Sequence, residues 1–244
     1  MSQMIMNRSK PMNRIVYSHY RREEVTEYLR ASGKERIDIL FIGATGAGKS
    51  STVNSLITAR VSGIGNGADP ETATIRRYNL SSDIKLWDTP GLGDSIEKDE
   101  RYEIEILKLL AVKKSNANGN ASPLIDLVVL IVDGSSREMG TSFKLLNGKL
   151  KKQIGSRKLL VFVNQADCAM HTHEHVFNKR RNKASPALQE FLEEKSLSVM
   201  NRLNESTGLE INRPLCYSAK YGFNVKKIFD RMLDTVMDKP LAAR

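Results

Sequence analysis

The amino-acid sequence predicts an α/β protein of three layers, with a mostly parallel sheet that has one antiparallel edge strand. Apolar runs typical of strands alternate with amphipathic runs typical of helices, which predicts a sheet covered by helices on both faces. Only Asp126 interrupts the apolar run from Leu124 to Val132, as in a strand buried on both sides. Two further strands are expected at residues 75–80 and 84–87, and the short polar turn between them predicts a hairpin.

The other elements follow from hydrophobic periodicity and from helix start and stop signals. Gly33, Gly155 and Gly208 are expected to end helices, and Ser185 followed by Pro186 to begin one. We expect an N-terminal tail and helix at residues 1–33 and a single domain at residues 34–244. Helices are predicted at residues 17–32, 49–58, 98–114, 141–154, 186–207 and 225–236, strands at 37–42, 158–163 and 214–217, and loops of small or polar residues at 61–74, 115–122 and 169–183.

The composition bounds the class of protein. At 244 residues and 40% hydrophobic content, the chain is long enough for one large domain. Lys and Arg outnumber Asp and Glu by 38 to 28, which fits a soluble basic protein and equally a polyanionic partner such as RNA or an anionic membrane surface. Its two cysteines encode no disulfide framework. No signal peptide and no run of bilayer-spanning length is found, so we expect a cytoplasmic protein without a transmembrane segment.

The strongest motif is G-x-x-x-x-G-K-S at residues 43–50, between an expected strand and an expected helix. Glycines in this pattern bring backbone N–H groups against a phosphate chain at a helix N-terminus, where the dipole favours negative charge. Lys49 is then expected to reach the β- and γ-phosphates, and Ser50 to ligate Mg²⁺. A glycine-rich turn without a ligand is the alternative. The residues expected to hold the phosphates are Gly43, Ala44, Thr45, Gly46, Ala47, Gly48, Lys49, Ser50 and Ser51.

Three other polar motifs also follow expected strands, and in such folds ligands bind at the carboxyl ends of the strands. Asp88 precedes Pro90 and Gly91, so its carboxylate can hold Mg²⁺ through water while the Gly91 N–H faces the γ-phosphate. In Asn164-Gln165-Ala166-Asp167, a carboxylate can accept hydrogen bonds from N1 and N2 of guanine, a pair of donors that adenine lacks. Ser218-Ala219-Lys220 can place a backbone N–H on the guanine O6.

Over about residues 37–237, these motifs resemble in order those of P-loop GTPases of the class that includes Era, TrmE and the septins. The loop wording is similar to septin-like and immunity-associated GTPases, whereas Asn164 to Asp167 is closest to uncharacterised bacterial Era-like proteins of the YfjP type. The resemblance implies a protein that binds GTP or GDP with Mg²⁺ and hydrolyses GTP. It also implies these roles: Ser50, Thr74 (or Thr72) and Asp88 at the metal, Lys49, Thr74 and Gly91 in hydrolysis, and Asn164, Gln165, Asp167, Ser218, Ala219 and Lys220 at the base.

Three departures from the family pattern affect the expected activity. Gln165 stands where the family usually has Lys, and because its alkyl stem can still cover the base, guanine specificity is expected to survive with a modest loss. Leu92 stands where Ras-like enzymes carry a Gln that positions water, and it cannot orient water by a hydrogen bond. Gly46 replaces the Asn of potassium-activated relatives, so no potassium dependence is expected. We therefore expect slow intrinsic hydrolysis that is accelerated by a partner or by dimerisation.

Several functions stay open at this point. The protein is expected to be a partner-regulated switch that acts on RNA or ribosomes; the alternatives are a septin-like assembly or membrane-surface GTPase that dimerises through its nucleotide face, and a nucleotide-binding module without turnover. The run His171 to His175 has zinc ligands but is better explained as a solvated loop. The basic run Lys179 to Lys183 and the lysines of residues 141–152 could contact RNA phosphates or be solvated faces.

Overall fold

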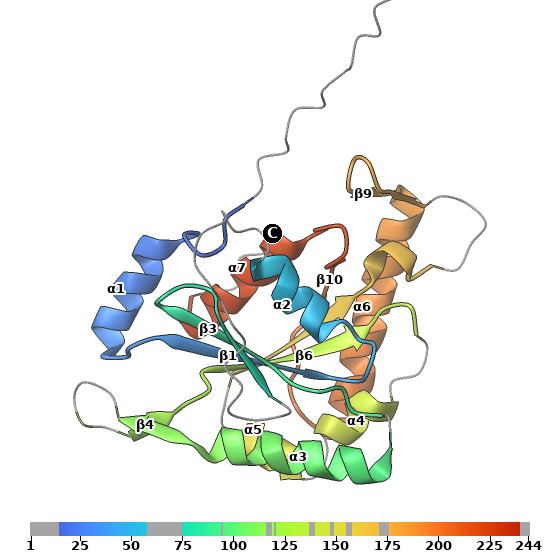
Figure 1. Ribbon diagram of the computed structural model, residues 1–244. Coiled ribbons are helices and arrows are strands. Elements are labelled where there is room, and N and C mark those ends of the chain that lie inside the picture. The colour runs from blue at the N-terminus through green and yellow to red at the C-terminus, as the bar shows by residue number, and fades with distance from the viewer. Residues whose placement is uncertain are drawn as a thin grey trace, which may run out of the picture.

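The molecule is organised around a six-stranded sheet, as the sequence predicts (Figure 1). The computed structural model describes residues 15–57, 75–93, 95–115, 119, 121–136, 140–146, 149–154, 158–170 and 176–239. Across the sheet, the strands are β10 (Leu215–Cys216), β7 (Lys158–Asn164), β6 (Leu127–Asp133), β1 (Ile37–Gly43), β3 (Ile84–Asp88) and β2 (Arg76–Asn79). All neighbours pair in parallel except β2, which is antiparallel to β3, so both the mostly parallel sheet and its antiparallel edge strand are confirmed.

Helices cover both faces of the sheet and make the three layers (Figure 1). One face packs against α1 (Arg22–Ser32), α2 (Lys49–Ile57) and α7 (Val225–Val236). The other packs against α3 (Ile96–Ala111), α4 (Gly140–Leu146), α5 (Lys149–Ile154) and α6 (Pro186–Thr207). Successive strand residues point to opposite faces, so Phe41 joins the first core and Ile42 the second. The strands are continuously apolar because both faces are buried.

The N-terminal segment packs on α7. The predicted helix begins later than expected, at Arg22, and the Tyr17 and Tyr20 rings that precede it lie against Phe229 with centroids 5.1 and 6.2 Å away. Arg21 adopts a left-handed conformation with φ 54°, and its guanidinium forms ion pairs with Asp230 and Asp234. Gly33 ends the helix with φ 66°, as predicted.

The helix predicted at residues 98–114 ends early, and this prediction was wrong. Strands β4 (Lys113–Ser115) and β5 (Ala121–Pro123) form a small antiparallel hairpin. This hairpin replaces the last turn of the predicted helix and part of the predicted loop. The cause is tertiary: the Lys114 ammonium donates to the Asp38 carboxylate at 2.9 Å and to the Arg36 carbonyl at 3.2 Å. A buried charge on β1 needs this partner, and it overrides the local helical preference of the sequence.

The single helix predicted at residues 141–154 was also wrong, because the structure has α4 and α5 as two short helices. They have different neighbours, since α5 packs on α3 and α4 on α6. Leu146, Leu150 and Ile154 are buried as predicted. Within the region predicted as a basic loop, β8 (Phe177–Asn178) and β9 (Lys183–Ala184) form a second hairpin.

Helix α6 matches its predicted limits. The Leu188 amide donates to the Ser185 hydroxyl at its start, and Gly208 closes its end with φ 66°. The loop predicted at residues 61–74 and the glycine predicted at 155 lie outside the described residues. Among the residues that the structure describes, no helix is both long and apolar enough to cross a membrane.

Candidate functional site

The predicted motifs meet at one edge of the sheet, where its parallel strands end. Ser50 at the start of α2 donates to the Asp88 carboxylate at the end of β3, with 2.6 Å between the two oxygens. The Asn164 side chain at the end of β7 donates to the Ala47 carbonyl at 3.0 Å and accepts from the Ala219 amide at 3.0 Å. Four segments that are distant in the sequence are thus joined by direct hydrogen bonds. Their convergence is what the pattern of polar residues at strand ends predicts.

The loop between β1 and α2 has the conformation that its glycines allow. Gly46 and Gly48 have φ values of 79° and 90°, which residues with a side chain rarely adopt. A Cβ added at Gly48 would lie 2.1 Å from the Asn164 side-chain nitrogen. The Lys49 side chain is buried, and its ammonium donates to the carbonyls of Gly43 at 3.0 Å and Ala44 at 2.9 Å. The ammonium is therefore held over the loop, next to the first turn of α2.

The segment after β3 lies directly against this loop. The Thr45 amide donates to the Leu92 carbonyl at 2.8 Å, and the Leu92 amide donates to the Gly43 carbonyl at 3.3 Å. A Cβ at Gly91 would stand 2.3 Å from the Thr45 Cα, so only glycine allows this approach. Leu92 is buried in the core on the α3 side of the sheet. Next along the chain, the Gly93 amide donates to the Asp99 carboxylate of α3 at 2.8 Å.

Asp88 and Ser50 fit a divalent cation. One Asp88 carboxylate oxygen accepts from Ser50, but the other is buried and has no hydrogen-bond partner among the described residues. Burial raises the pKa of the Asp88 carboxyl, while the Ser50 hydrogen bond and the charges of Lys49 and Arg76 act in the opposite direction. A carboxylate and a hydroxyl beside a phosphate-binding loop are the oxygen ligands that Mg²⁺ takes. Thr72 and Thr74, the two candidates for the switch threonine, lie outside the described residues.

Gln165 makes a contact that the sequence reading missed. Its φ is 61°, and its side-chain amide donates to the Gly46 carbonyl at 2.9 Å, so it ties the loop after β7 to the phosphate loop. The Ser135 hydroxyl donates to the Gln165 side-chain oxygen at 3.4 Å from the end of β6. The sequence predicts only that the alkyl stem of Gln165 covers the base, whereas in the structure its terminal amide binds the Gly46 carbonyl. The length of the Gln side chain was the only signal for this contact.

Asp167 and the loop after β10 complete the base side of the site. Asp167 is half-buried in the short 3₁₀ helix η1 (Ala166–Cys168). The Ala166 amide donates to the Tyr217 carbonyl at 3.0 Å, which holds this helix beside the segment Ser218-Ala219-Lys220. Ser218 is buried and its hydroxyl accepts from the Tyr221 amide at 3.3 Å, while Lys220 is exposed.

Two buried residues outside the motifs, Thr52 and Tyr217, connect elements on which the site is built. The Tyr217 hydroxyl is fully buried and lies 2.5 Å from the Thr52 hydroxyl of α2. Thr52 also donates to the Gly48 carbonyl at 2.7 Å. Burial raises the pKa of the Tyr217 phenol, so it stays protonated as a donor. Sequence reasoning missed this pair, because a Thr and a Tyr separated by 165 positions have no local signal that they meet.

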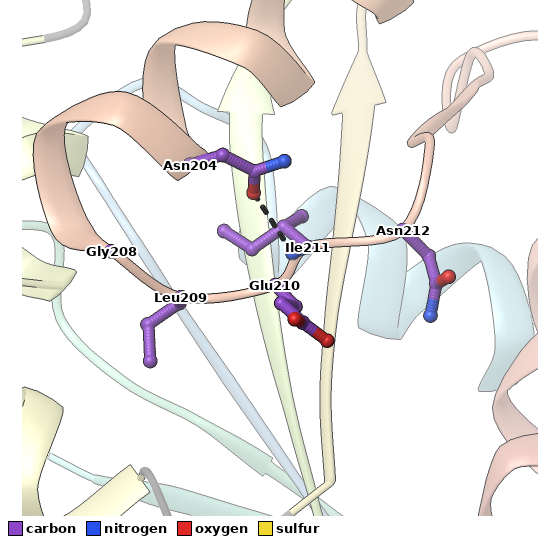
Figure 2. A pocket seen from close by; sticks show the side chains of 6 residues that line it. All are labelled: Asn204, Gly208, Leu209, Glu210, Ile211 and Asn212. Atoms are coloured by element: carbon purple, nitrogen blue, oxygen red, sulfur yellow. Dashed lines mark hydrogen bonds between the residues drawn. The ribbon is translucent and has the colours of Figure 1, made fainter.

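One predicted motif cannot be placed, and one surface hollow lies away from the site. The run His171 to His175 lies outside the described residues, and the described residues contain no group of three or more His, Cys, Asp or Glu placed to hold a metal. A surface hollow lies at the turn from α6 to β10, where the Ile211 amide donates to the Asn204 side chain at 2.9 Å (Figure 2). It shares Asn212 with a second hollow lined by Lys158, so both lie near the start of β7, at the opposite edge from Asn164.

Comparison with known proteins gives the family and the fold. A model of the AIG1 family matches residues 37–210. The GTPase Era of Rhizobium meliloti (strain 1021) is 30% identical over 131 residues, or 53% of this chain and 37% of Era, so the chain spans little more than a third of Era's length.

Two solved structures share the fold at low sequence identity. The structure of Toc33 from Arabidopsis thaliana in complex with GDP and Mg²⁺ has a TM-score of 0.56 at 14% identity, covering 91% of this chain and 92% of that one. A probable GTP-binding protein engB has a TM-score of 0.52 at 22% identity, covering 83% and 100%. The likeness confirms the P-loop GTPase fold that the motifs predict.

Proposed function

The chain belongs to the AIG1 family of P-loop GTPases, and on this premise we propose that it hydrolyses GTP to GDP and phosphate slowly, as a partner-regulated switch. The observation that carries the proposal is the pair of hydrogen bonds from Ser50 to Asp88 and from Asn164 to Ala47, which join motifs 38 and 117 positions apart. These bonds put the phosphate loop, the metal candidates and the base motif in one site.

The phosphate chain is proposed to lie along residues 43–51. Backbone amides at the start of α2 favour its negative charge, and Lys49 adds an ammonium that is already held over the loop by two carbonyls. Ser50 and Asp88 would hold Mg²⁺, which when bound supplies a counter-charge for the phosphate oxygens. Thr74 or Thr72 is the proposed third metal residue.

Guanine is proposed to be selected by Asp167. A carboxylate accepts two hydrogen bonds from N1 and N2 of guanine, and adenine cannot donate them. Asn164 accepts from the Ala219 amide and so holds the loop after β10, whose backbone is proposed to contact O6. Gln165 replaces an ammonium by a neutral amide but keeps a hydrogen bond to the phosphate loop. This contact supports a site that stays closed around the base.

Slow turnover is proposed because the described residues supply no side chain that would orient water at Gly91. Leu92 is apolar and buried in the core, so catalysis needs a group from elsewhere. The Gly91 N–H is proposed to face the γ-phosphate. Since the same segment is tied to Asp99 of α3, its displacement would reach the surface of that helix.

RNA or the ribosome is the proposed partner, on the basis of the net charge of +10. The buried Leu92 favours a second candidate, in which another copy of the chain supplies the missing group across the nucleotide face. Light scattering with GTP, GDP and no nucleotide separates the two, because only the second predicts a mass that doubles with nucleotide. A cytosolic location and an Era-like subfamily of the YfjP type stay predictions.

Nucleotide affinity and phosphate release test the proposed activity. We expect the wild type to prefer guanine nucleotides to ATP, Lys49→Ala to lose most affinity for the triphosphate, and Asp167→Asn to lose the preference for guanine. Glu190→Gln, which removes an exposed carboxylate on α6, is the matched control and should leave both unchanged. A preference for ATP, or an unchanged preference in Asp167→Asn, contradicts the base assignment. GTP that binds without phosphate release indicates a binding module instead.

A further inference from the structure

The hairpin of β8 and β9 carries the densest positive charge in the described residues that surround the site. Its four-residue turn and the start of β9 hold Lys179, Arg180, Arg181 and Lys183, all exposed. No Asp or Glu occurs between His175 and Gln189. Among the described residues, none of these four cations forms an ion pair with a carboxylate, so their charge is not neutralised within the part of the chain that the structure describes.

The hairpin is hydrogen-bonded across its strands and turn, which distinguishes it from an irregular basic loop. Phe177 pairs with Ala184 and Asn178 with Lys183 across the two strands. The Arg181 amide donates to the Asn178 side chain at 2.9 Å, and the Ser185 amide to the Val176 carbonyl at 2.8 Å. Backbone bonds therefore fix the positions from which the cations extend. A preorganised set of charges loses less conformational entropy on binding.

Aromatic side chains connect the hairpin to the base side of the nucleotide site. The Phe177 ring lies 5.4 Å from that of Tyr221 and 5.6 Å from that of Phe223, measured between centroids. Tyr221 directly follows Lys220, and its ring has the ammonium groups of Lys179 at 6.0 Å and Lys220 at 5.3 Å. The positive surface thus continues from the hairpin to the loop proposed to contact guanine.

The shape and composition of the hairpin indicate the class of partner. It projects from the N-terminal end of α6 at the periphery of the molecule (Figure 1). Its one large apolar side chain, Phe177, is buried, and the large apolar side chains that are exposed elsewhere in the described residues, such as Ile96, do not belong to it. A membrane-inserting loop would expose an apolar tip. An exposed tip rich in Lys and Arg, without an apolar side chain at the surface, instead suits the phosphate backbone of a nucleic acid.

We propose that the basic hairpin, residues 178–183, is a docking site for the phosphate backbone of RNA. The proposal deepens the proposed function, since it rests on the same kind of partner and gives that partner a surface. Contacts with phosphates position a protein without reading the sequence, so binding through this surface should be strongly dependent on salt and weakly dependent on sequence.

The test compares two double variants that remove the same charge. Arg180→Ala/Arg181→Ala removes two cations from the hairpin, and Lys108→Ala/Arg202→Ala removes two exposed cations from α3 and α6. Fluorescence anisotropy with a labelled RNA duplex measures Kd over a range of KCl concentrations. The same duplex sequence as DNA distinguishes RNA from nucleic acid in general, and vesicles with anionic lipid test the membrane alternative. Binding of fluorescent GDP and the circular dichroism spectrum report separately on the nucleotide site and on folding.

We expect the hairpin variant to bind RNA about tenfold more weakly, and the slope of log Kd against log salt to fall by about 2. The control variant should change little. Equal weakening in both variants, or no binding of RNA by the wild type, overturns the proposal, as does hairpin-dependent binding to vesicles alone. If DNA binds as tightly as RNA, the hairpin is a docking site for nucleic-acid backbones in general and has no preference for RNA. If the wild type did not bind GDP, the proposed function would be contradicted, but the RNA-binding result would still test the docking site.

Discussion

Two buried aspartates on neighbouring strands have opposite surroundings. Asp38 lies near the start of β1 and Asp88 at the end of the adjacent parallel strand β3, so they lie towards opposite ends of the strands. Both are at most 5% exposed. Asp38 accepts from the Trp87 indole at 2.9 Å and from the Lys114 ammonium at 2.9 Å, with the Arg36 guanidinium 3.5 Å away. Asp88 accepts from Ser50 alone, and its other oxygen has no partner among the described residues.

On our proposal, this difference separates a structural charge from one that binds a metal. A buried carboxylate is costly unless it is paired and hydrogen-bonded. Around Asp38 the chain itself supplies the partners, including a lysine from a hairpin that local sequence would have made helical. Around Asp88 one coordination position is left for something else, which is what a metal ligand requires. The following experiments test this contrast from the largest expected effect to the smallest.

Asp38→Asn should destabilise the protein most. The substitution removes the nearest counter-charge of Lys114, at 2.9 Å, and leaves the Asp126 carboxylate at 3.7 Å. Breaking a buried ion pair from one side costs about 3 kcal/mol. Unfolding in urea, followed by circular dichroism, measures the loss. The affinity of the remaining folded protein for GDP should be unchanged, because Asp38 is at the opposite edge from the phosphate loop. A variant as stable as the wild type would mean that the charge pair is dispensable.

Asp88→Asn should not lower the free energy of unfolding as Asp38→Asn does. Removing an incompletely paired buried charge relieves desolvation, so we expect stability in urea to stay equal or to rise by about 1 kcal/mol. The effect of Mg²⁺ on GTP affinity should disappear. Titrating fluorescent GTP with and without Mg²⁺ measures this, with Asp38→Asn as the matched variant that keeps its Mg²⁺ dependence. If Asp88→Asn retains full Mg²⁺ dependence, the proposed metal site is wrong.

Tyr217→Phe gives a neutral comparison for the two charged positions. It removes one buried hydroxyl 2.5 Å from Thr52, while Thr52 keeps its bond to the Gly48 carbonyl, so the cost should be about 1 kcal/mol. Because the pair joins α2 to the loop after β10, GDP should also dissociate faster. Thr52→Val, which removes this bond and also the bond to the Gly48 carbonyl, should cost more stability and should also speed the dissociation of GDP. A slower dissociation in both variants would contradict a supporting role.

Glu24→Gln, at the surface, should have the smallest effect on stability. The Arg21 hydrogen bond, followed by that of Lys239, lowers the pKa of Glu24 from 4.5 to about 2. Since the folded-state pKa is the lower one, the stabilisation is complete above about pH 4.5 and is lost as the pH falls towards 2. The side chain is 42% exposed, so solvent screening limits the contribution to about 0.5 kcal/mol. The free energies of unfolding in urea of the wild type and Glu24→Gln should differ at pH 7, and the difference should shrink as the pH falls towards 2.

Prediction from the sequence succeeds and fails for identifiable reasons. The limits of α6 were predictable because Ser185 and Gly208 have local roles, and the edge hairpin because strands 75–80 and 84–87 share a short turn. The end of α3 was not, because Lys114 is held by Asp38 from another part of the chain. Gln165 directly follows the predicted strand, but its bond to Gly46 was missed, since this bond depends on how two loops approach each other.

By itself, the sequence determined the order of elements, the burial of the strands on both faces and the edge at which the polar motifs gather, because periodicity and strand-end positions are local properties. The tertiary structure alone decided which carboxylate is satisfied and which keeps an oxygen without a partner in the described residues. Whether a buried polar atom finds a partner depends on residues brought together from distant positions, and the free energy of burial is settled only there.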